Sequence, residues 1–441
     1  MTMKIAILGF GREGKSVLKF LKKRNPRADI KILDQKFDKN YLKNLSSFDV
    51  IFRSPGVPYN LPEIQRAIKK GVKFSSATAL FFEKAKGKIV GITGTKGKGT
   101  TATLLYKILK ACNKSVYLAG NIGKPVIEIL PKLRKNSIVI LELSSFQLQD
   151  LKKSSDIAVV LDIFPDHLDL HRNLREYISA KSAISKFQNP NDKVFYFADN
   201  QWAKWLARKS RAKKIPVSPQ NLKLFKPEDL KIPGQHNFRN AIMATSVALL
   251  LGCPKEKILR VVKNFRGNEH RLELVRTIRV YPLLKNRNPR QSASINFYND
   301  SASTNPQTAA AAIRAFKEPK ILISGGKDKG LNYSPLAKAL KNSNTKLVIL
   351  FGQNKNKILR QIAKSKVQVV LVKDLKTAVN LAYKTAKKLT RSVVSSQWSA
   401  VSSQWSAVNI LFSPASASFD MFKDYADRGE KFKELVKNLR R

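Results

Sequence analysis

The stretch GITGTKGKGTTATLL, residues 91–105, predicts a strand, a glycine-rich loop and a helix in direct succession. The apolar run KIVGIT leads into the loop, and helix-forming residues follow it. Backbone N–H groups at the start of a helix attract an anion, and a lysine in the loop completes the charge balance. We therefore expect this segment to bind the phosphates of a nucleotide within an α/β domain.

The loop departs from the usual phosphate-binding pattern, G-x-x-x-x-G-K-[ST], at two positions. Ile92 stands at the first glycine position, and Gly99 stands where a hydroxyl ordinarily binds Mg²⁺. We expect Thr100, Thr101 or water to supply the missing oxygen. A glycine-rich turn without a ligand is the structural alternative. The predicted phosphate-binding residues are Gly94, Thr95, Gly97, Lys98, Gly99 and Thr100.

The size and composition of the chain indicate a multidomain globular protein. Its 441 residues, 43% of them hydrophobic, exceed what one core can hold, and about two to four domains are expected. The two cysteines, Cys112 and Cys253, lie too far apart in sequence for a metal motif or a disulfide framework, which favours a reducing compartment. No apolar run reaches the roughly 18 to 20 residues of a membrane span, and MTMKIAILGF predicts a buried strand rather than a signal peptide. We expect a cytoplasmic protein.

The net charge is strongly positive, at +52 from 83 Lys and Arg against 31 Asp and Glu. Such an excess attracts nucleic acid, anionic lipid or polyphosphate substrates. A general lysine bias of the source proteome is the simpler explanation, because the charges are scattered and do not alternate with aromatic residues. We expect no specific nucleic-acid partner.

The N-terminal segment MKIAILGFGREGKSVLKFLKKR shows the pattern of a dinucleotide-binding unit. Gly9, Gly11 and Gly14 form a G-x-G-x-x-G sequence between a predicted strand and a predicted helix, and Asp34 ends the next apolar run. In Rossmann folds an acid at that place bonds a ribose hydroxyl. A tight turn without a ligand is the alternative.

Two further α/β series follow, and domain boundaries are expected near residues 87 and 271. The second series contains SIVILEL, IAVVLDI and KVFYFA, and the third contains KILISGG, KLVILFG, VQVVLV and NILFSP. Strands that alternate with helices favour largely parallel sheets. The basic stretch around residues 283–294 predicts an exposed loop, and the doubled heptapeptide SSQWSAV at 395–408 predicts a lengthened loop rather than a repeat fold.

Together these motifs resemble the Mur ligase family, and most closely its D-glutamate-adding members. GTKGKGT is similar to the family's phosphate loop, GT-x-GK-[ST]-T, and ten later and earlier motifs occur in the family's order over nearly the whole chain. These are RSPGV at 53–57, GNIG at 120–123, ELSSFQL at 142–148, DHLDLH at 166–171, YISAKSAI at 177–184, GQHNFRN at 234–240, HRLE at 270–273, NDSASTN at 299–305, GGKDKG at 325–330 and SPASASFDMF at 413–422.

The resemblance implies three domains and one reaction. Residues 1–87 are expected to form a Rossmann-like domain for UDP, residues 88–271 a central P-loop-type ATPase, and residues 272–441 a Rossmann-like domain for the amino acid. The implied enzyme is an ATP-dependent ligase of peptidoglycan synthesis: the carboxylate of UDP-N-acetylmuramoyl-L-alanine attacks ATP, and D-glutamate displaces phosphate from the acyl phosphate. The implied cofactors are ATP and two Mg²⁺ ions.

The resemblance also implies the site residues. Lys98, Glu142, His167 and Lys181 are the implied catalytic group, with Thr100, Glu142, His167 and a carbamylated Lys181 on the metal ions. By the same resemblance, Asn240, Arg271 and Asp300 bind the adenine, ribose and phosphates of ATP. Gly11, Asp34 and Ser54 bind the UDP moiety. The acceptor's muramoyl-alanine end is implied for Asn121, Ser144, Ser145 and Gln147, and D-glutamate for Thr304, Lys329, Ser418 and Phe419.

Two departures leave alternatives open. Gly99 lacks the hydroxyl that the family pattern places there for Mg²⁺. Ala302 stands where the family pattern DSKATN has a lysine, and Lys327 or Lys329 can compensate for the missing positive charge. A family member that adds another amino acid, or a nucleotide-binding homologue with impaired catalysis, therefore remains possible. A monomer without membrane contact is expected.

Overall fold

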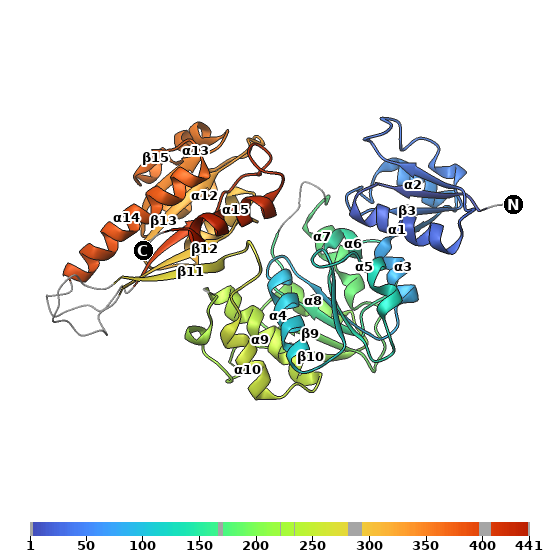
Figure 1. Cartoon of the computed structure of the whole chain (residues 1–441). Helices are drawn as coiled ribbons and strands as arrows, with labels where there is room; N and C mark the ends of the chain where they lie inside the picture. The colour runs from blue at the N-terminus through green and yellow to red at the C-terminus, as the bar shows by residue number, and fades with distance from the viewer. Residues whose placement is uncertain are drawn as a thin grey trace. The chain divides into compact units, whose positions relative to one another are not determined.

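The structure, a computed structural model, describes residues 3–165, 171–220, 222–232, 234–280, 293–396 and 407–439. His167, most of the basic stretch at 283–294 and most of the SSQWSAV duplication lie outside the described residues. The described chain falls into two compact units, the first comprising residues up to Lys226 with His236–Lys263, and the second Pro227–Gln235 with the residues from Asn264 onward. Three sheets occur in the described residues, one in each of the three predicted domain ranges (Figure 1).

The first sheet has the strand order β2-β1-β3-β4 and is parallel throughout. Its strands are β1 (Ile5–Leu8), β2 (Ile30–Leu33), β3 (Val50–Arg53) and β4 (Lys73–Ser75), and its helices are α1 (Arg12–Arg24), α2 (Pro62–Lys69) and α3 (Ala77–Lys84). Ile64 and Ala67 of α2 pack on one apolar cluster, while α1 and α3 pack on another. The predicted strand, turn and helix at the N-terminus is confirmed.

The second sheet has the order β10-β9-β8-β5-β7-β6, also parallel. Its strands are β5 (Lys88–Thr93), β6 (Val116–Gly120), β7 (Ile138–Glu142), β8 (Ile157–Val160), β9 (Lys193–Phe197) and β10 (Lys213–Val217). Its helices are α4 (Lys98–Ala111), α5 (Val126–Ile129), α6 (Ser145–Leu148), α7 (Leu174–Ala180), α8 (Gln201–Arg208), α9 (Gln235–Leu250) and α10 (Lys255–Asn264). Strand β5, which leads into the glycine-rich loop, lies inside this sheet between β7 and β8.

The first two sheets belong to one compact unit because their helices share a core. Phe81 of α3 and Val17 of α1 lie in the same apolar cluster as Val126 and Ile127 of α5. Burial of large apolar side chains is the main favourable term in such packing. One apolar cluster therefore spans the boundary expected near residue 87, while a second cluster belongs to the first sheet alone.

The third sheet has the order β11-β12-β16-β13-β14-β15, with only the β11–β12 pair antiparallel. Its strands are β11 (Glu273–Val280), β12 (Ala293–Asn299), β13 (Lys320–Gly325), β14 (Thr345–Phe351), β15 (Val369–Leu371) and β16 (Ala407–Phe412). Helices α14 (Leu375–Ser396) and α15 (Tyr425–Lys437) cover one face, and α11 (Pro306–Arg314), α12 (Ser334–Lys341) and α13 (Lys355–Ile362) cover the other (Figure 1). A doubly covered, largely parallel sheet is the arrangement expected of the third α/β series.

No helix in the described part of the chain is long and apolar enough to cross a membrane.

Lys320, at the start of β13, is a buried cation in the third sheet. Its side chain is 0% exposed, and the Nζ atom has no hydrogen-bond partner in the described structure. Burial lowers the pKa of Lys320 from its ordinary 10.5 to about 8. The folded protein therefore loses this proton at a lower pH than the unfolded chain.

Replacement of Lys320 by Met should stabilise the protein at pH 7 and reduce its gain in stability at high pH. The wild type should become more stable by about 3 kcal/mol as the pH rises from 8 through 10.5, because only the unfolded chain still binds the proton there. Thermal melting of wild type, K320M and the exposed-lysine control K341M at pH 7 and 9.5 measures this effect. Equal pH dependence in K320M and wild type would contradict it.

Candidate active site

The loop between β5 and α4 can be built only with glycine at two positions. Gly94 (φ +152°) leaves no room for a Cβ atom, which would lie 2.7 Å from Cβ of Leu161. Gly97 (φ +84°) precedes α4, and a Cβ there would lie 2.2 Å from Oδ1 of Asn240 in α9. The backbone thus turns tightly into the helix, and its N–H groups stand at the helix start, as phosphate binding requires.

Two lysines converge on the carbonyl oxygen of Gly94. Lys98 donates from Nζ to the oxygens of Gly94 (3.0 Å) and Thr95 (3.1 Å). Lys181, which follows α7 and is 2% exposed, reaches the same Gly94 oxygen at 3.4 Å, and its Nζ lies 4.5 Å from the centre of the Tyr177 ring. Two ammonium groups that share one acceptor create a strongly positive point at the loop, which favours an anion there.

Thr95 fixes the loop against the segment that follows β8. Its N–H donates to the Asp162 oxygen (2.8 Å), and its hydroxyl meets the hydroxyl of Tyr177 (2.9 Å). The same hydroxyl bonds the backbone oxygen and N–H of Phe164, at 3.0 and 2.9 Å. Thr95 therefore orients the loop, and its hydroxyl is committed to these contacts.

Glu142 lies beside the loop, at the carboxyl end of β7. It pairs in register with Ile92 of β5 on one side and Gly120 of β6 on the other, and it is 8% exposed. Ligands of parallel sheets bind beyond this edge. Thr100 is also buried (8% exposed), and the hydroxyl of its neighbour Thr101 is buried and has no hydrogen-bond partner among the residues that the structure describes.

The oxygen groups at this edge suit a hard cation such as Mg²⁺. Among the described residues, no group of three or more His, Cys, Asp or Glu side chains is placed to hold a metal ion. The predicted ligand His167 lies outside the described residues. The Glu142 carboxylate and the Thr100 hydroxyl fit the predicted metal by chemistry and by their place next to the loop.

Helix α9 contributes two residues near the loop: Asn240, which was predicted, and Arg239, which was not. Arg239 makes paired hydrogen bonds to Asp162 (3.0 and 2.8 Å) and to Asp199 (2.7 and 2.8 Å). These bonds lower the pKa of Asp199 and raise that of Arg239. Because Asp162 also accepts from Thr95, Arg239 connects α9 to the phosphate loop. GQHNFRN contains this residue, but nothing in the sequence pairs it with acids 40 and 77 positions away.

The first G-x-G-x-x-G turn has two sterically required glycines, and neither is Gly11. A Cβ on Gly9 would lie 2.9 Å from Cβ of Ser54, and one on Gly14 would lie 2.3 Å from the Gly9 oxygen, whereas one on Gly11 meets nothing within 4 Å. The Ser54 hydroxyl donates to the Gly9 oxygen (2.6 Å). Asp34 accepts from the N–H groups of Phe10 (2.6 Å) and Lys36 (2.9 Å), which lowers its pKa. Ser54 and Asp34 therefore shape the loop that was predicted to hold UDP.

The predicted acceptor residues lie next to this turn, within the same compact unit. Gln147 donates to Glu13 of α1 (2.7 Å), and burial raises the pKa of Glu13. Ser144 and Gln147 form a capping box at the start of α6, and the Ser145 hydroxyl meets Nε2 of His171 (3.0 Å). The Asn121 N–H bonds the Glu142 oxygen (3.1 Å). The SSFQ motif thus contacts α1 of the first sheet, and the GNIG motif bonds the backbone at Glu142.

Arg53 was missed as part of this region. It is 2% exposed, and it donates to Asp150 from Nε (3.0 Å) and Nη2 (2.9 Å) and to the backbone oxygen of Phe146 (2.9 Å). Both donors reach the same oxygen, Oδ2 of Asp150, and charge-assisted hydrogen bonds of this kind are stronger than those between neutral groups. The Arg53–Asp150 pair joins β3 to the segment after β7. In the sequence, only the RSPGV motif pointed to Arg53.

Asp300 lies in the second unit, at the end of β12. Burial raises the pKa of Asp300 to about 7, although the Ser413 hydroxyl (2.7 Å) and the Leu272 N–H (3.2 Å) donate to it. Arg271 is exposed and contributes an attractive charge.

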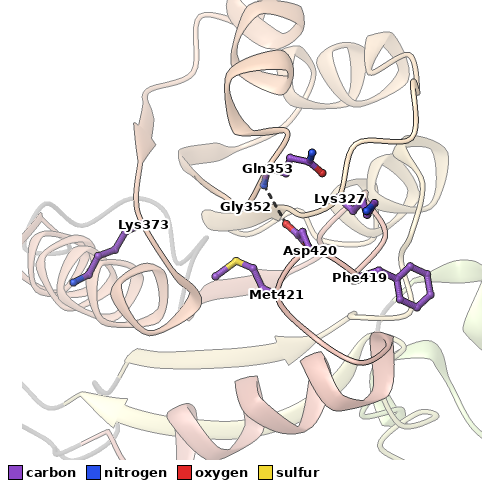
Figure 2. Close-up of a pocket in the computed structure, with 7 residues that line it drawn as sticks. All are labelled: Lys327, Gly352, Gln353, Lys373, Phe419, Asp420 and Met421. Atoms are coloured by element: carbon purple, nitrogen blue, oxygen red, sulfur yellow. Dashed lines mark hydrogen bonds between the residues drawn. The ribbon is translucent and has the colours of Figure 1, made fainter.

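The loops that follow β13, β14, β15 and β16 surround a pocket of about 470 Å³ in the second unit. Figure 2 shows its lining, which consists of Lys327, Gly352, Gln353, Lys373, Phe419, Asp420 and Met421. Of the predicted D-glutamate residues, Phe419 lines this pocket, Lys329 lies with Nζ 5.6 Å from the Phe419 ring centre, and Ser418 is buried. Thr304 is half-buried and is not among the lining residues. Asp420, which accepts from the Gln353 N–H (3.1 Å), was missed.

The fold and the loop define a P-loop-type nucleotide-binding protein that has two Rossmann-like sheets in addition to the central one. The family models named Mur ligase middle domain and Mur ligase, glutamate ligase domain match residues 92–248 and 286–396. The chain belongs to the Mur ligase family.

Curated relatives and solved structures agree with this assignment. The chain is 33% identical to the UDP-N-acetylmuramoylalanine--D-glutamate ligase of Acetivibrio thermocellus, over 99% of this chain and 96% of the relative. It is 34% identical to the ligase of the same name from Ruminiclostridium cellulolyticum, over 91% and 85%. The structure of the Thermotoga maritima UDP-N-acetylmuramate-alanine ligase aligns with a TM-score of 0.54 at 18% identity, over 99% of both chains, and shows the shared fold.

Replacement of Gly97 by Ala should abolish most ATP binding. A Cβ at this position collides with Asn240 and adds strain at positive φ, so we expect at least a 10-fold weaker nucleotide affinity and a loss of roughly 1–3 kcal/mol of stability. Titration calorimetry with ATP and thermal melting measure both effects. The control is G56A, whose Cβ has open space; equal behaviour of the two variants would refute the steric argument.

Replacement of Asp300 by Asn should remove part of the pH dependence of stability. Between its ordinary pKa of 3.8 and about 7, the folded protein holds a proton that the unfolded chain has lost, so stability falls as the pH rises through this window by roughly 4 kcal/mol. We expect D300N to lose less stability than wild type between pH 4.5 and 7.5. The exposed control D29N should follow the wild type, and an unchanged slope in D300N would count against a buried, protonated Asp300.

Proposed function

We propose that the protein is an ATP-dependent ligase that adds D-glutamate to UDP-N-acetylmuramoyl-L-alanine in peptidoglycan precursor synthesis. The observation that carries this proposal is the 33% identity, over 99% of this chain, to a relative named for that activity. An oxygen of the acceptor carboxylate attacks the γ-phosphorus of ATP, and ADP leaves. The amine of D-glutamate then attacks the acyl carbon, and phosphate leaves as the amide forms.

The phosphate loop is assigned the binding of ATP. Negative charge gathers on the transferred phosphoryl group, and fixed N–H dipoles with nearby cations stabilise it. Lys98 is the cation assigned to the transferred phosphate. Its hydrogen bonds to the backbone oxygens of Gly94 and Thr95 hold its ammonium group at the loop. Asn240 against Gly97 places α9 beside the nucleotide. By the resemblance to the family, Arg271 and Asp300 are assigned to its phosphates and ribose.

Glu142, Thr100 and His167 are assigned to Mg²⁺, which supplies charge neutralisation on the phosphates when bound. Lys181 is assigned as a carbamate. Its buried amine shares the Gly94 oxygen with Lys98, so two positive charges stand close together. Carbamylation removes one of them, keeps an N–H that can donate to Gly94, and adds oxygen atoms suited to a hard cation.

The acceptor and the amino acid are assigned to two surfaces. Gly11, Asp34 and Ser54 serve the UDP end, and Asn121, Ser144, Ser145 and Gln147 the muramoyl-alanine end. The pocket in Figure 2 is assigned to D-glutamate, because Lys327 in its lining offers positive charge to a carboxylate. Thr304, Lys329, Ser418 and Phe419 complete this assignment, with Lys327 or Lys329 offsetting the absent lysine at Ala302.

Phosphate release from ATP should require both UDP-N-acetylmuramoyl-L-alanine and D-glutamate. Omission of either substrate should remove the activity, and K98A should lower kcat by about 100-fold or more, as loss of a charge-stabilising donor does. The neighbouring K96A is the matched control and should stay within a few-fold of wild type. A coupled phosphate assay measures these rates.

The same assay separates the alternatives. Release with another amino acid in place of D-glutamate would assign a different ligase of the family. ATP binding without phosphate release under any combination would indicate an impaired homologue, with Gly99 and Ala302 as the first positions to restore.

A further inference from the structure

An exposed aromatic side chain, Phe37, stands at the predicted UDP end of the protein, outside the apolar clusters. Phe37 is 69% exposed and belongs to none of the apolar clusters of the described structure. Its ring centre lies 6.3 Å from that of Phe10, at an interplanar angle of 59°. Phe10 is only partly buried against the core that α1 shares with β1. The Phe10 ring also has Nζ of Lys15 5.9 Å from its centre. The two rings form a corner of which the Phe37 side is open to water.

The corner is held in place by Asp34. The Phe10 N–H donates to Oδ2 of Asp34 (2.6 Å), and the Phe37 N–H donates to the backbone oxygen of Asp34 (3.0 Å). Oδ1 of Asp34 accepts from the Lys36 N–H (2.9 Å). These contacts fix both aromatic residues around a carboxylate that retains further acceptor capacity.

The position of the corner in the sheet is that of a nucleotide base. The first sheet has the order β2-β1-β3-β4, so the chain changes direction between β1 and β3, and ligands of such sheets bind beyond the carboxyl ends at that switch. Phe10 follows β1, while Asp34 and Phe37 follow β2. In this arrangement the acid after the second strand meets the ribose, so the groups just beyond it meet the base.

We propose that Phe37, with Phe10, forms the stacking platform for the uracil ring of the UDP-linked acceptor, beside Asp34. This inference rests on the proposed function, because it takes the uridine nucleotide from the proposed substrate. Stacking on an aromatic side chain tolerates any base. The platform therefore supplies affinity for the nucleotide end and leaves the reacting end unaffected.

Binding of UDP alone tests the platform directly. We expect F37A to bind UDP and UDP-N-acetylmuramoyl-L-alanine about 10-fold more weakly than wild type, while F37W restores the affinity. The KM of F37A for the acceptor should rise by a similar factor, with kcat and the affinity for ATP unchanged. Titration calorimetry and steady-state kinetics give these values.

A matched control and a second readout keep the outcomes separate. Phe187 is likewise exposed (43%) but lies in the central domain, so F187A should bind UDP as the wild type does. If wild type releases phosphate only with D-glutamate and F37A binds UDP with unchanged affinity, the platform is wrong and the proposed function stands. A parallel loss of ATP affinity or of melting temperature in F37A would mean a structural role and would also overturn the platform. Absence of D-glutamate-dependent release in wild type would instead refute the proposed function.

Discussion

The carbonyl oxygen of Gly94 is the point on which the candidate active site depends. Two lysines from different segments, Lys98 and Lys181, donate to it. They reach it only because β5 lies inside the central sheet and because glycine at positions 94 and 97 lets the chain turn against Leu161 and Asn240. A loop held this closely from several sides presents its N–H groups in a fixed orientation, which is what stabilises developing charge.

The same constraint extends through the central domain by a chain of polar contacts. Thr95 bonds the Asp162 backbone, Arg239 bonds the Asp162 carboxylate, and Asn240 beside it packs on Gly97. Helix α9 is therefore attached to the phosphate loop at two places. The N-terminal sheet is attached to the central one by a shared apolar core and by the buried Arg53–Asp150 pair. The proposed UDP and acceptor residues thus lie on one compact unit, with the loop and Glu142.

Much of the fold could be predicted because its signals are local. The turn after KIVGIT, the G-x-G-x-x-G turn and the apolar runs of the three sheets each depend on residues close in sequence, and the strands and helices lie where those runs predict them. Contacts between distant segments could not be predicted in this way. Nothing in the sequence pairs Arg239 with Asp162 and Asp199, or Arg53 with Asp150, and the pocket lining of Gln353 and Asp420 depends on four separate loops. The role of His167 stays a prediction, as do the individual site assignments.

The central claim is that the loop holds ATP so that the acceptor carboxylate receives the γ-phosphoryl group. The most direct test of this claim follows an oxygen isotope from the acceptor carboxylate into the released phosphate. With ¹⁸O in the carboxylate of UDP-N-acetylmuramoyl-L-alanine and unlabelled ATP and D-glutamate, mass spectrometry of the released phosphate should find one ¹⁸O atom per phosphate formed, because the acyl phosphate breaks at its carbon–oxygen bond. Phosphate without the label would contradict the account.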